Sequence, residues 1–405
     1  MKRSAILFGI VTAGCLSAQA QTTLQASDGA TITVMENARI YVNGDMVMEQ
    51  NSSLTNKGTI VLEKKNGSAN FTDNNKQAYN YGPGKFIFTG NGTQSISSRS
   101  RFGIIEVDDK GLNLLTNTNA SQWVLKNGVV NTGGFTAIAS GTDAAAVVND
   151  AENKNYYNSW FNGNLRRYID PGQVDQYLFP VGDDRRVKYC VLDNLTSEPI
   201  SGVQYVDASF ARPASLTTDA RLSENGLQYT GVNRNGMWTL APDAQPASGK
   251  FNLRVSLADF SGLNDNRFAL LNQAGGSWLV PQGSLLPAEG ADGRTVISGY
   301  AQRNKLSNFS QYAVAMMTAP EKDNAVSVKV FPDPVTNYEF FVQLTNCQLK
   351  ELKLYTTEGN QVTVSSVVQK NEQVRVSLPP SFAKGAYTVQ LFTDKGLRTA
   401  KIIVL

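Results

Sequence analysis

Short β-prone runs separated by turn residues dominate the chain and constrain its fold more than any other feature. Runs at residues 32–34, 40–42, 59–62 and 86–88 are separated by turns rich in Gly and Asn, such as residues 43–44. Gly and Asn tolerate the positive φ that tight turns require. An apolar period of about 3.6 residues, which would indicate an amphipathic helix, is not sustained anywhere in the chain. The sequence therefore predicts an all-β protein in which helices are nearly absent.

Two architectures fit residues 21–170: a sandwich of hairpins, or a β-solenoid in which short parallel strands coil around a common axis. Numerous short strands without a strict repeat favour an irregular solenoid whose rungs bury a narrow aliphatic stack. The stretch also resembles the β-helical amino-terminal regions of exported surface proteins, with residues 92–97 and 102–107 marking successive rungs. We therefore expect a solenoid, and the sandwich of hairpins is the alternative.

Composition excludes several classes of function. The 405 residues contain no histidine, which excludes a Ser-His-Asp triad, a Cys-His pair and a His-containing zinc site. Lys and Arg number 37 against 34 Asp and Glu, and no basic run interleaved with aromatic residues is present, so nucleic acid is not expected as a partner. Phosphate-loop, dinucleotide, C-x-x-C and G-x-S-x-G motifs are also missing. We therefore predict no catalytic residues, no metal and no cofactor.

The N-terminus has the pattern of a secretory signal peptide, residues 1–20. Lys2 and Arg3 precede an apolar stretch at residues 5–16, and Ala18 and Ala20 form an A-x-A cleavage site. A transmembrane anchor would need about 20 apolar residues, so this stretch is too short to span a membrane. We expect cleavage after Ala20 and export of the mature chain.

The three cysteines do not form a disulfide framework. Cys15 follows a small residue, as in a lipoprotein signal, but Thr12 stands where such signals carry an aliphatic residue, and we do not expect lipidation. Cys190 and Cys347 are predicted to be buried small hydrophobic residues in strands of different domains.

A cluster of aromatic and arginine side chains marks the end of the predicted solenoid. Its members include Tyr156, Tyr157, Trp160, Arg166 and Arg167. Rings and guanidinium groups suit a platform for a glycan or a peptide. The alternative is a cap that closes the solenoid core and packs it on the next domain. We favour the cap, because large apolar areas are usually buried.

Residues 171–318 carry longer, alternating strands spaced by turns, which predicts a β-sandwich of immunoglobulin-like size. Trp238 and Trp278 are expected to anchor its core, since alternation of apolar and polar residues flanks both.

Acidic residues offer few candidates for chemistry. The pairs at residues 108–109 and 183–184 fall in predicted turns, where adjacent side chains point in different directions and are solvated by default. Asp259 and the loop at residues 264–266 contain oxygen ligands for calcium, but their spacing is not that of an EF-hand.

A polar linker at residues 319–325 leads to a compact β pattern at residues 326–405, in which seven short strands would form a small sandwich. Four ordered motifs lie in this region: a V-x-P-D-P-V opening, a strand ending in an E-G turn, a G-x-Y strand, and a final lysine-led apolar strand. The motif residues are Val330, Pro332, Asp333, Pro334, Gly359, Gly385, Tyr387 and Lys401.

These motifs resemble the C-terminal sorting domain of proteins exported by the bacterial type IX secretion system. Asp333 stands where asparagine is more usual. The resemblance implies that shuttle and outer-membrane translocon proteins of this system recognise the domain after the signal peptide has directed the chain across the inner membrane. In many relatives a surface peptidase then cuts within the preceding linker and joins the new terminus to an anionic polysaccharide lipid. The alternative is an ordinary terminal sandwich that stabilises its neighbour.

We therefore expect a non-enzymatic protein, secreted or on the outer face of the outer membrane, that acts as a binding, adhesive or structural module for an unknown surface ligand. One alternative is an accessory or sensing component of the secretion apparatus that keeps its sorting domain. A second is a carbohydrate-active enzyme that uses acidic residues of a solenoid groove, which requires acids aligned along one face.

Overall fold

The protein is all-β, as predicted. The computed structural model describes residues 17–20, 23–65, 67–149, 158–212, 222–285, 293–318, 327–357, 359–370 and 373–405. Within these ranges the regular structure consists of β-strands and short 3₁₀ turns such as Ala144–Ala146 and Val296–Ser298. In the described ranges, no helix has the length and apolar character needed to cross a membrane.

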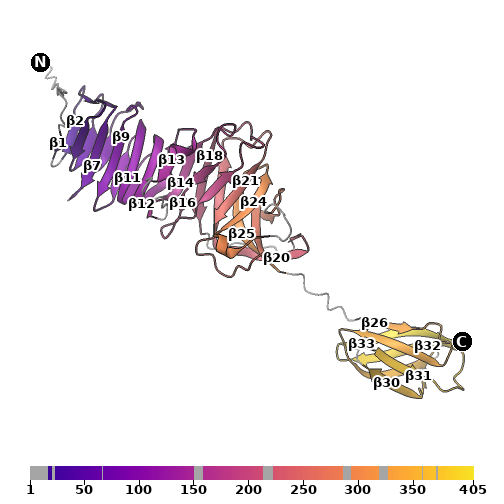
Figure 1. Cartoon of the computed structure of the whole chain (residues 1–405). Coiled ribbons are helices and arrows are strands. Elements are labelled where there is room, and N and C mark those ends of the chain that lie inside the picture. Colours follow the sequence, from indigo (N-terminus) through magenta and orange to yellow (C-terminus); the bar gives the residue numbers. More distant parts are fainter. Residues whose placement is uncertain are drawn as a thin grey trace. The chain divides into compact units, whose positions relative to one another are not determined.

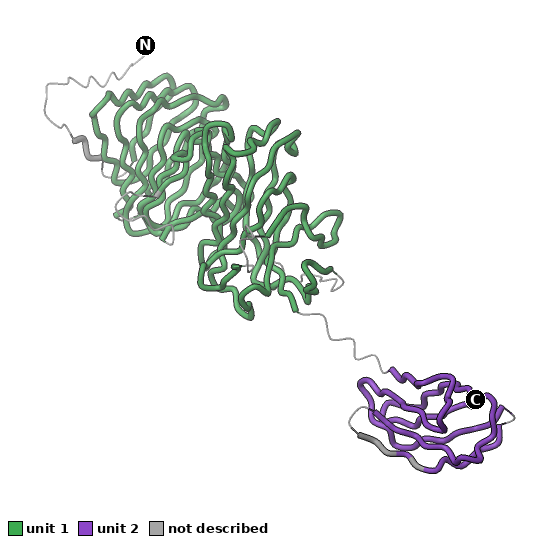
Figure 2. The backbone as a smooth tube through the Cα atoms, turned by 45° about the vertical axis from the view of Figure 1, so that its right-hand side comes forward, with its two compact units in different colours: residues 1–319 green, residues 320–405 purple. Residues whose placement is uncertain are grey.

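The chain divides into two compact units, residues 1–319 and residues 320–405, which we call unit 1 and unit 2 (Figure 2). Each unit has its own hydrophobic core among the described residues.

Unit 1 begins with a β-solenoid of about seven turns over residues 23–182, whose parallel strands stack side by side (Figure 1). One face is built from β4 (Arg39–Val42), β7 (Thr59–Lys64), β9 (Lys85–Gly90), the middle of β11 (Arg101–Leu114), β12 (Thr118–Ala139) and β13 (Val147–Asn149). A second face contains β2 (Thr23–Ala26), β5 (Asp45–Met48), β8 (Phe71–Asp73), β10 (Gln94–Ser97) and the end of β11. A third begins with β3 (Thr31–Val34) and β6 (Ser53–Asn56).

The register of the parallel strands stacks the same inward position from rung to rung. Ile60, Phe86, Ile105, Trp123 and Val147 form one such column, and each is buried. Because side chains alternate between the two faces of a strand, the residues directly before and after each of these positions lie on the outer surface. The predicted narrow stack is therefore present, although it contains aromatic as well as aliphatic side chains.

Strands β11 and β12 differ from the sequence-based expectation of separate short strands. Both continue through the corners of the solenoid, and register shifts in their pairing mark the bends. Gly128 makes one corner with a φ of 85°, and a Cβ there would lie 2.2 Å from the carbonyl oxygen of Asp109. A glycine inside the strand thus allows the bend without ending the ladder.

The expected signal-cleavage residues lie in β1 (Ser17–Ala20), which pairs in parallel with β4. Ala18 is the register partner of Ile40, and Ala20 that of Val42. Cleavage after Ala20 would remove β1. The signal peptide itself stays a prediction.

The solenoid continues directly into the sandwich of unit 1. β14 (Phe161–Tyr168) pairs in parallel with β12 and β16 (Val181–Gly182), and antiparallel with β18 (Tyr205–Ala211). The sheet then runs through β20 (Leu227–Pro242), β25 (Gln311–Thr318), β22 (Phe268–Ala274) and β23 (Ser277–Leu279). The opposing sheet is β15 (Tyr177–Phe179), β17 (Cys190–Asp193), β21 (Phe251–Ser256) and β24 (Tyr300–Leu306). Parallel pairing therefore extends past residue 170, the boundary expected from the sequence.

The two predicted tryptophan anchors of the sandwich are both buried. Trp238 belongs to the core that the solenoid and the sandwich share. Trp278 packs in a separate cluster that includes Tyr229 and Leu271.

Unit 2 is a sandwich of two four-stranded antiparallel sheets. One sheet has the order β26 (Ser327–Phe331), β27 (Glu339–Thr345), β31 (Gln373–Ser377), β30 (Ser366–Lys370). The other has the order β29 (Gln361–Val362), β28 (Leu349–Thr356), β32 (Gly385–Thr393), β33 (Gly396–Val404). The described residues thus form eight strands where the sequence predicted seven.

One prediction for the cysteines was wrong in part. Cys190 is buried in β17 of unit 1, as expected. Cys347 is only half-buried and lies in the turn between β27 and β28, because β27 ends at Thr345. Both are free thiols, and they lie in different units.

Candidate functional site

The terminal strand β33 is held at its end by the V-x-P-D-P-V opening of unit 2. Asp333 accepts a hydrogen bond at Oδ1 from the backbone N–H of Ile403, with an N to O distance of 2.8 Å. Val335 donates its backbone N–H to the carbonyl of Ile403 (2.7 Å) and accepts one from the N–H of Leu405 (2.9 Å). Val335 is completely buried. The opening motif therefore fastens the last three residues of the chain.

The G-x-Y motif also lies against the terminal strand. Gly385 is the register partner of Val404, and Tyr387 that of Ile402. The Tyr387 hydroxyl donates to the carbonyl of Ala383 (2.8 Å), and its ring centroid lies 4.8 Å from that of Phe382. The opening motif, which is distant in sequence, and the G-x-Y motif of the preceding strand thus both contact β33, which carries the lysine-led motif.

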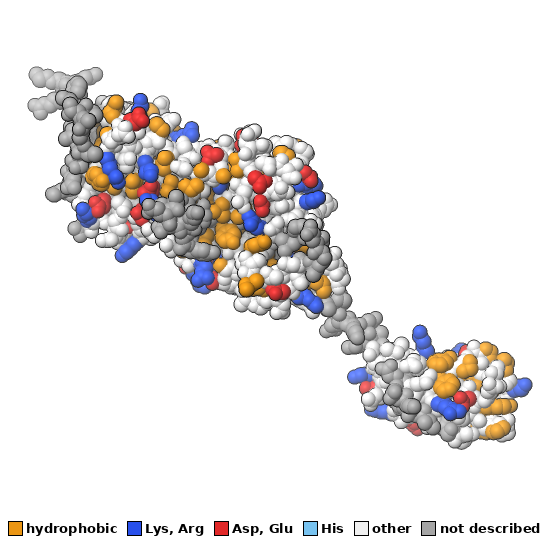
Figure 3. Space-filling model, viewed as in Figure 1, with side chains coloured by type: hydrophobic (Ala, Val, Ile, Leu, Met, Phe, Trp, Pro, Cys, Tyr) orange, Lys and Arg blue, Asp and Glu red, His pale blue; other side chains and the backbone are white. Residues whose placement is uncertain are grey.

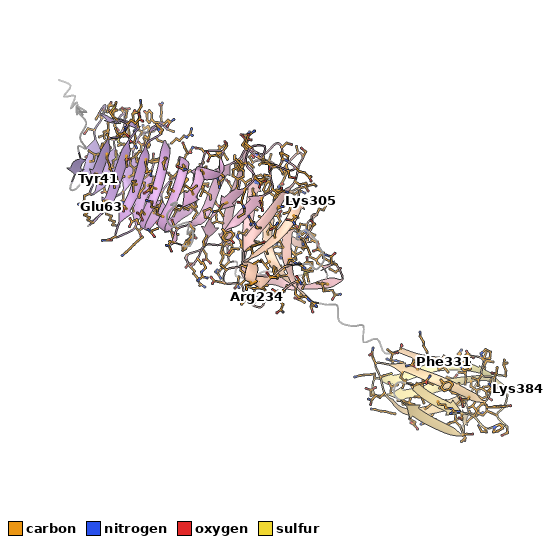
Figure 4. The ribbon with its side chains drawn as sticks, viewed as in Figure 1. Tyr41, Glu63, Arg234, Lys305, Phe331 and Lys384 are labelled. Atoms are coloured by element: carbon orange, nitrogen blue, oxygen red, sulfur yellow. The ribbon has the colours of Figure 1, made fainter. Side chains whose placement is uncertain are left out.

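The other motif residues have separate positions. Val330 is half-buried in β26 opposite Val342, and the exposed Pro332 and Pro334 flank Asp333. Lys401 is exposed on β33 opposite Thr388. Phe331 and Lys384, which directly precede Pro332 and Gly385, are labelled in Figure 4.

Gly359 closes the turn between β28 and β29, away from β33 in the strand order of the sheet. Its φ is 88°, and its N–H donates to the carbonyl of Thr356 (3.0 Å). A glycine adopts this left-handed conformation at no steric cost, which explains the E-G turn.

The terminal strand carries apolar side chains on both of its faces. Ile402 and Val404 point into the core of unit 2, whereas Leu397, Ile403 and Leu405 are 49%, 47% and 54% exposed. Leu397 and Ile403 thus make the outer face of β33 partly apolar.

The described members of the aromatic and arginine cluster pack and form hydrogen bonds within unit 1. Trp160 is buried, and its Nε1–H donates to the carbonyl of Asp183 (2.8 Å). Arg167 is fully buried and donates to the carbonyls of Leu178 (2.7 Å) and Ala144 (2.9 Å). The cluster therefore joins the last solenoid rungs to β15, which is where a cap would lie.

Arg166 lies on the opposite side of β14 from Arg167. Its Nε and NH2 groups donate to the two carboxylate oxygens of Asp207 (2.7 and 2.8 Å), and its guanidinium lies 3.8 Å from the ring centroid of Tyr205. The hydrogen bonds to Asp207 raise the pKa of Arg166. Tyr156 and Tyr157 lie outside the described residues. Ligand binding by this cluster stays a prediction.

Two acidic side chains of the solenoid, Glu106 and Asp73, have ion-pair or hydrogen-bond partners within it. Glu106 is buried between Lys85 Nζ (2.7 Å) and Lys126 Nζ (3.0 Å). Burial favours the neutral acid, but the hydrogen bonds from the two lysines outweigh it and hold the pKa of Glu106 below its ordinary value. Asp73 accepts hydrogen bonds from the hydroxyls of Tyr81 and Ser100.

The pair at residues 108–109 was expected in a turn, and that prediction was wrong. Both residues lie inside β11, at a register shift in its pairing with β12. Asp109 is buried, and this burial raises the pKa of its carboxyl group. The pair at residues 183–184 does lie in a loop, where Arg212 binds Asp183.

A second ion cluster surrounds Asp259, the candidate calcium ligand. Its carboxylate accepts from Arg186 (2.7 Å) and lies 3.5 Å from Lys188 Nζ. The Lys188 side chain is fully buried, and this burial lowers its pKa. The carboxylate therefore already has two cationic partners. No group of three or more acidic or cysteine side chains suited to a metal ion occurs in the part of the chain that the structure describes.

A cavity of about 530 Å³ opens at one end of the sandwich of unit 1. The hairpin β22–β23 and the segment between β24 and β25 line it, and the neighbouring Lys305 is labelled in Figure 4. Its polar lining includes Asn272, Gln282 and Asn308. Sequence reasoning missed this site, because the lining residues are dispersed over the chain and form no contiguous motif.

Comparison with known proteins supports one of these sites. Residues 329–405 match a family model described as a secretion system C-terminal sorting domain. No curated protein and no solved structure matches the chain.

Unit 2 is thus a β-sandwich export domain that fastens its own terminal strand. More specifically, it is a type IX secretion C-terminal sorting domain, and the chain is a cargo of that system. This domain implies interaction with the secretion machinery and export to the cell surface or the medium.

Proposed function

We propose that the protein is a non-enzymatic binding module, which unit 2 delivers to the outer face of the outer membrane. Unit 1 carries the binding function, and unit 2 is the export signal. The observation that supports this proposal most is the ladder on the outer surface of the solenoid. Successive rungs place Tyr41, Val61, Ile87, Glu106, Val124 and Val148 at the same outward register position. Val61 and Glu106 are buried, and the other four are half-buried.

This ladder makes an extended surface. Figure 3 shows hydrophobic side chains gathered in a band along this part of the solenoid, and Figure 4 labels Tyr41 and Glu63 beside it. Regular rungs that present equivalent side chains suit an extended ligand, as in other solenoid proteins. The contacts of Glu106 and Asp73 support a structural rather than a catalytic use of the solenoid acids.

The proposal is tested by intact-mass analysis of the protein recovered from the cell surface, in wild type and in a strain that lacks the surface peptidase. We expect wild-type cells to yield a chain that has lost unit 2 near residue 323 and gained a heterogeneous mass at its new terminus. The peptidase-deficient strain should yield a chain that still ends at Leu405.

An unmodified chain that ends at Leu405 in wild-type cells would contradict anchoring of unit 1. It would favour the alternative in which the protein keeps its sorting domain as an accessory or sensing component of the secretion apparatus. Binding partners would then be sought among envelope proteins by cross-linking.

A further inference from the structure

The cavity in the sandwich of unit 1 contains a buried hydrogen-bonding atom that has no partner in the described part of the chain. The Oδ1 atom of Asn272 is buried and has no hydrogen bond within the described structure. Asn272 belongs to β22, opposite Tyr312 of β25 and Leu279 of β23. A buried polar atom without a partner destabilises the folded chain. A ligand that donates a hydrogen bond would remove this cost.

The rim of the cavity adds further polar side chains. Gln282 and Asn308 are exposed, Ser307 is half-buried, and the described structure gives none of the three side chains a hydrogen bond. The side chains that line the cavity carry no ionised group. An ionic ligand would therefore lose its hydration without gaining a countercharge, which disfavours charged ligands.

The rest of the lining is apolar. Leu279 is 43% exposed, and Val280, Pro281, Leu306 and Phe309 complete this side of the cavity. A ligand that fits must therefore present hydroxyl groups to the amides and C–H surface to the apolar residues. The volume lies in the range of small-molecule sites, about 300–1,000 Å³.

The segment that carries Ser307 and Asn308 is held in place by its neighbours. Gln245 donates from Nε2 to the carbonyl of Phe309 (3.0 Å) and accepts from its N–H (2.8 Å). The Tyr312 hydroxyl donates to the carbonyl of Asn308 (2.7 Å). These bonds fix the backbone and leave the amide of Asn308 available. A rim fixed in this way lowers the ordering cost of binding.

We propose that this cavity binds an uncharged saccharide. Side-chain amides offer a donor and an acceptor side by side, which matches neighbouring sugar hydroxyls. A peptide strand would instead pair with main-chain groups at a sheet edge, whereas the unpartnered groups here are side chains. The proposal rests on the proposed function, in which unit 1 is the binding module, and it adds a site in the sandwich that is separate from the solenoid ladder.

The test is a titration of the full chain with neutral sugars, monitored by saturation-transfer and chemical-shift NMR. The panel holds glucose, galactose, mannose, N-acetylglucosamine and their β-1,4-linked disaccharides, up to about 10 mM, where dissociation constants near 1 mM are measurable. We expect saturable binding of at least one neutral sugar. The uronic acid of that sugar should bind at least about 10-fold more weakly, because no charged side chain is among those that line the cavity.

Matched variants locate the site. N308A and Q282A remove side chains that have no hydrogen bond in the described structure, so each variant should fold as the wild type. The two substitutions combined should weaken binding at least about 10-fold. Asn272→Leu should weaken binding to a similar degree. The control is Q273L, a neighbour on the other face of β22 whose Nε2 donates to Gly276, and it should leave binding unchanged.

Three results would overturn the proposal: no saturable binding by any neutral sugar, sugar binding that the three cavity variants leave intact, or preferential binding of a neutral Ser-Gly-Asn peptide. None of these results would affect the proposed function, which the mass analysis of surface-recovered protein tests separately.

Discussion

At the scale of single residues, polar side chains in this protein mainly secure the ends and corners of strands. Asp333 connects the opening motif of unit 2 to the terminal strand, and Arg167 joins solenoid rungs to β15 through backbone carbonyls. The sequence indicated that both residues were important, since each lay in a motif or a cluster. It could not indicate their partners, because Ile403 lies 70 positions from Asp333.

Asp333→Ala should loosen the end of β33. The change removes the acceptor for the Ile403 N–H, and the free energy of unfolding of unit 2 should fall by about 1 kcal/mol. Urea unfolding of residues 327–405 measures this loss. Asp333→Asn is the control, because it keeps an oxygen at the same position and should change stability little. Equal losses in both variants would contradict a role for this hydrogen bond.

The contribution of Glu106 to stability should depend on pH. Its folded-state pKa lies below the ordinary value of 4.5. The stabilisation is therefore fully present above pH 4.5 and is lost as pH falls through the folded-state pKa. Glu106→Gln should unfold about 1–2 kcal/mol more easily than wild type at pH 7.

Urea unfolding of the wild type and of Glu106→Gln between pH 7 and pH 3 measures this dependence. The difference between the two proteins should shrink at the acid end of the series. A difference that stays constant over the whole range would show that the lysine contacts of Glu106 contribute no charge-dependent stability.

At the scale of elements, the alternation of apolar and polar residues and the turn residues predicted the strands well. They did not predict that β11 and β12 continue through the corners of the solenoid. Alternating burial of Phe86 and Phe88 in β9 follows directly from the sequence. The corners of β11 and β12 look like turns in the sequence, because Gly128 and its neighbours have turn chemistry. The structure keeps each corner within one strand, because pairing with the neighbouring rungs resumes after the bend. At Gly128 the Ser159 hydroxyl donates to the backbone carbonyl.

Gly128→Ala should therefore disturb the solenoid far more than Gly134→Ala in the same strand. At Gly128 a Cβ meets backbone at 2.2 Å and φ is 85°, whereas at Gly134 nothing lies within 4 Å. Gly128→Ala should cost well over about 1 kcal/mol of unfolding free energy, and Gly134→Ala should be neutral or slightly stabilising. Thermal unfolding followed by circular dichroism distinguishes them. Similar melting temperatures for both variants would argue against a strand-internal corner.

At the scale of the whole molecule, two separate cores predict two separate unfolding events. Phe88→Ala opens a cavity in the solenoid core and should destabilise unit 1 by about 3–5 kcal/mol. The melting temperature of unit 2 should be the same in this variant as in the isolated fragment of residues 327–405. Calorimetry of the full chain and of the variant measures both transitions. A single transition, or a shift of both by Phe88→Ala, would contradict the independence of the units.

The sequence predicted unit 2 most completely, because each of its motifs is a short continuous segment and the motifs follow one another in order. The contact of both the opening motif and the G-x-Y motif with β33 is a tertiary feature that only the structure reveals. The cavity of unit 1 lay beyond prediction for the same reason, since Gln245, Asn272 and Asn308 meet only after the sandwich has formed.

The central claim is that unit 2 exports unit 1. The most direct test compares the full chain with a chain that ends at residue 318, in cells with a working type IX system, by protease accessibility at the cell surface and by periplasmic fractionation. The account predicts that the full chain reaches the surface or the medium, while the shortened chain stays folded in the periplasm. Equal amounts of both chains outside the cell would contradict it.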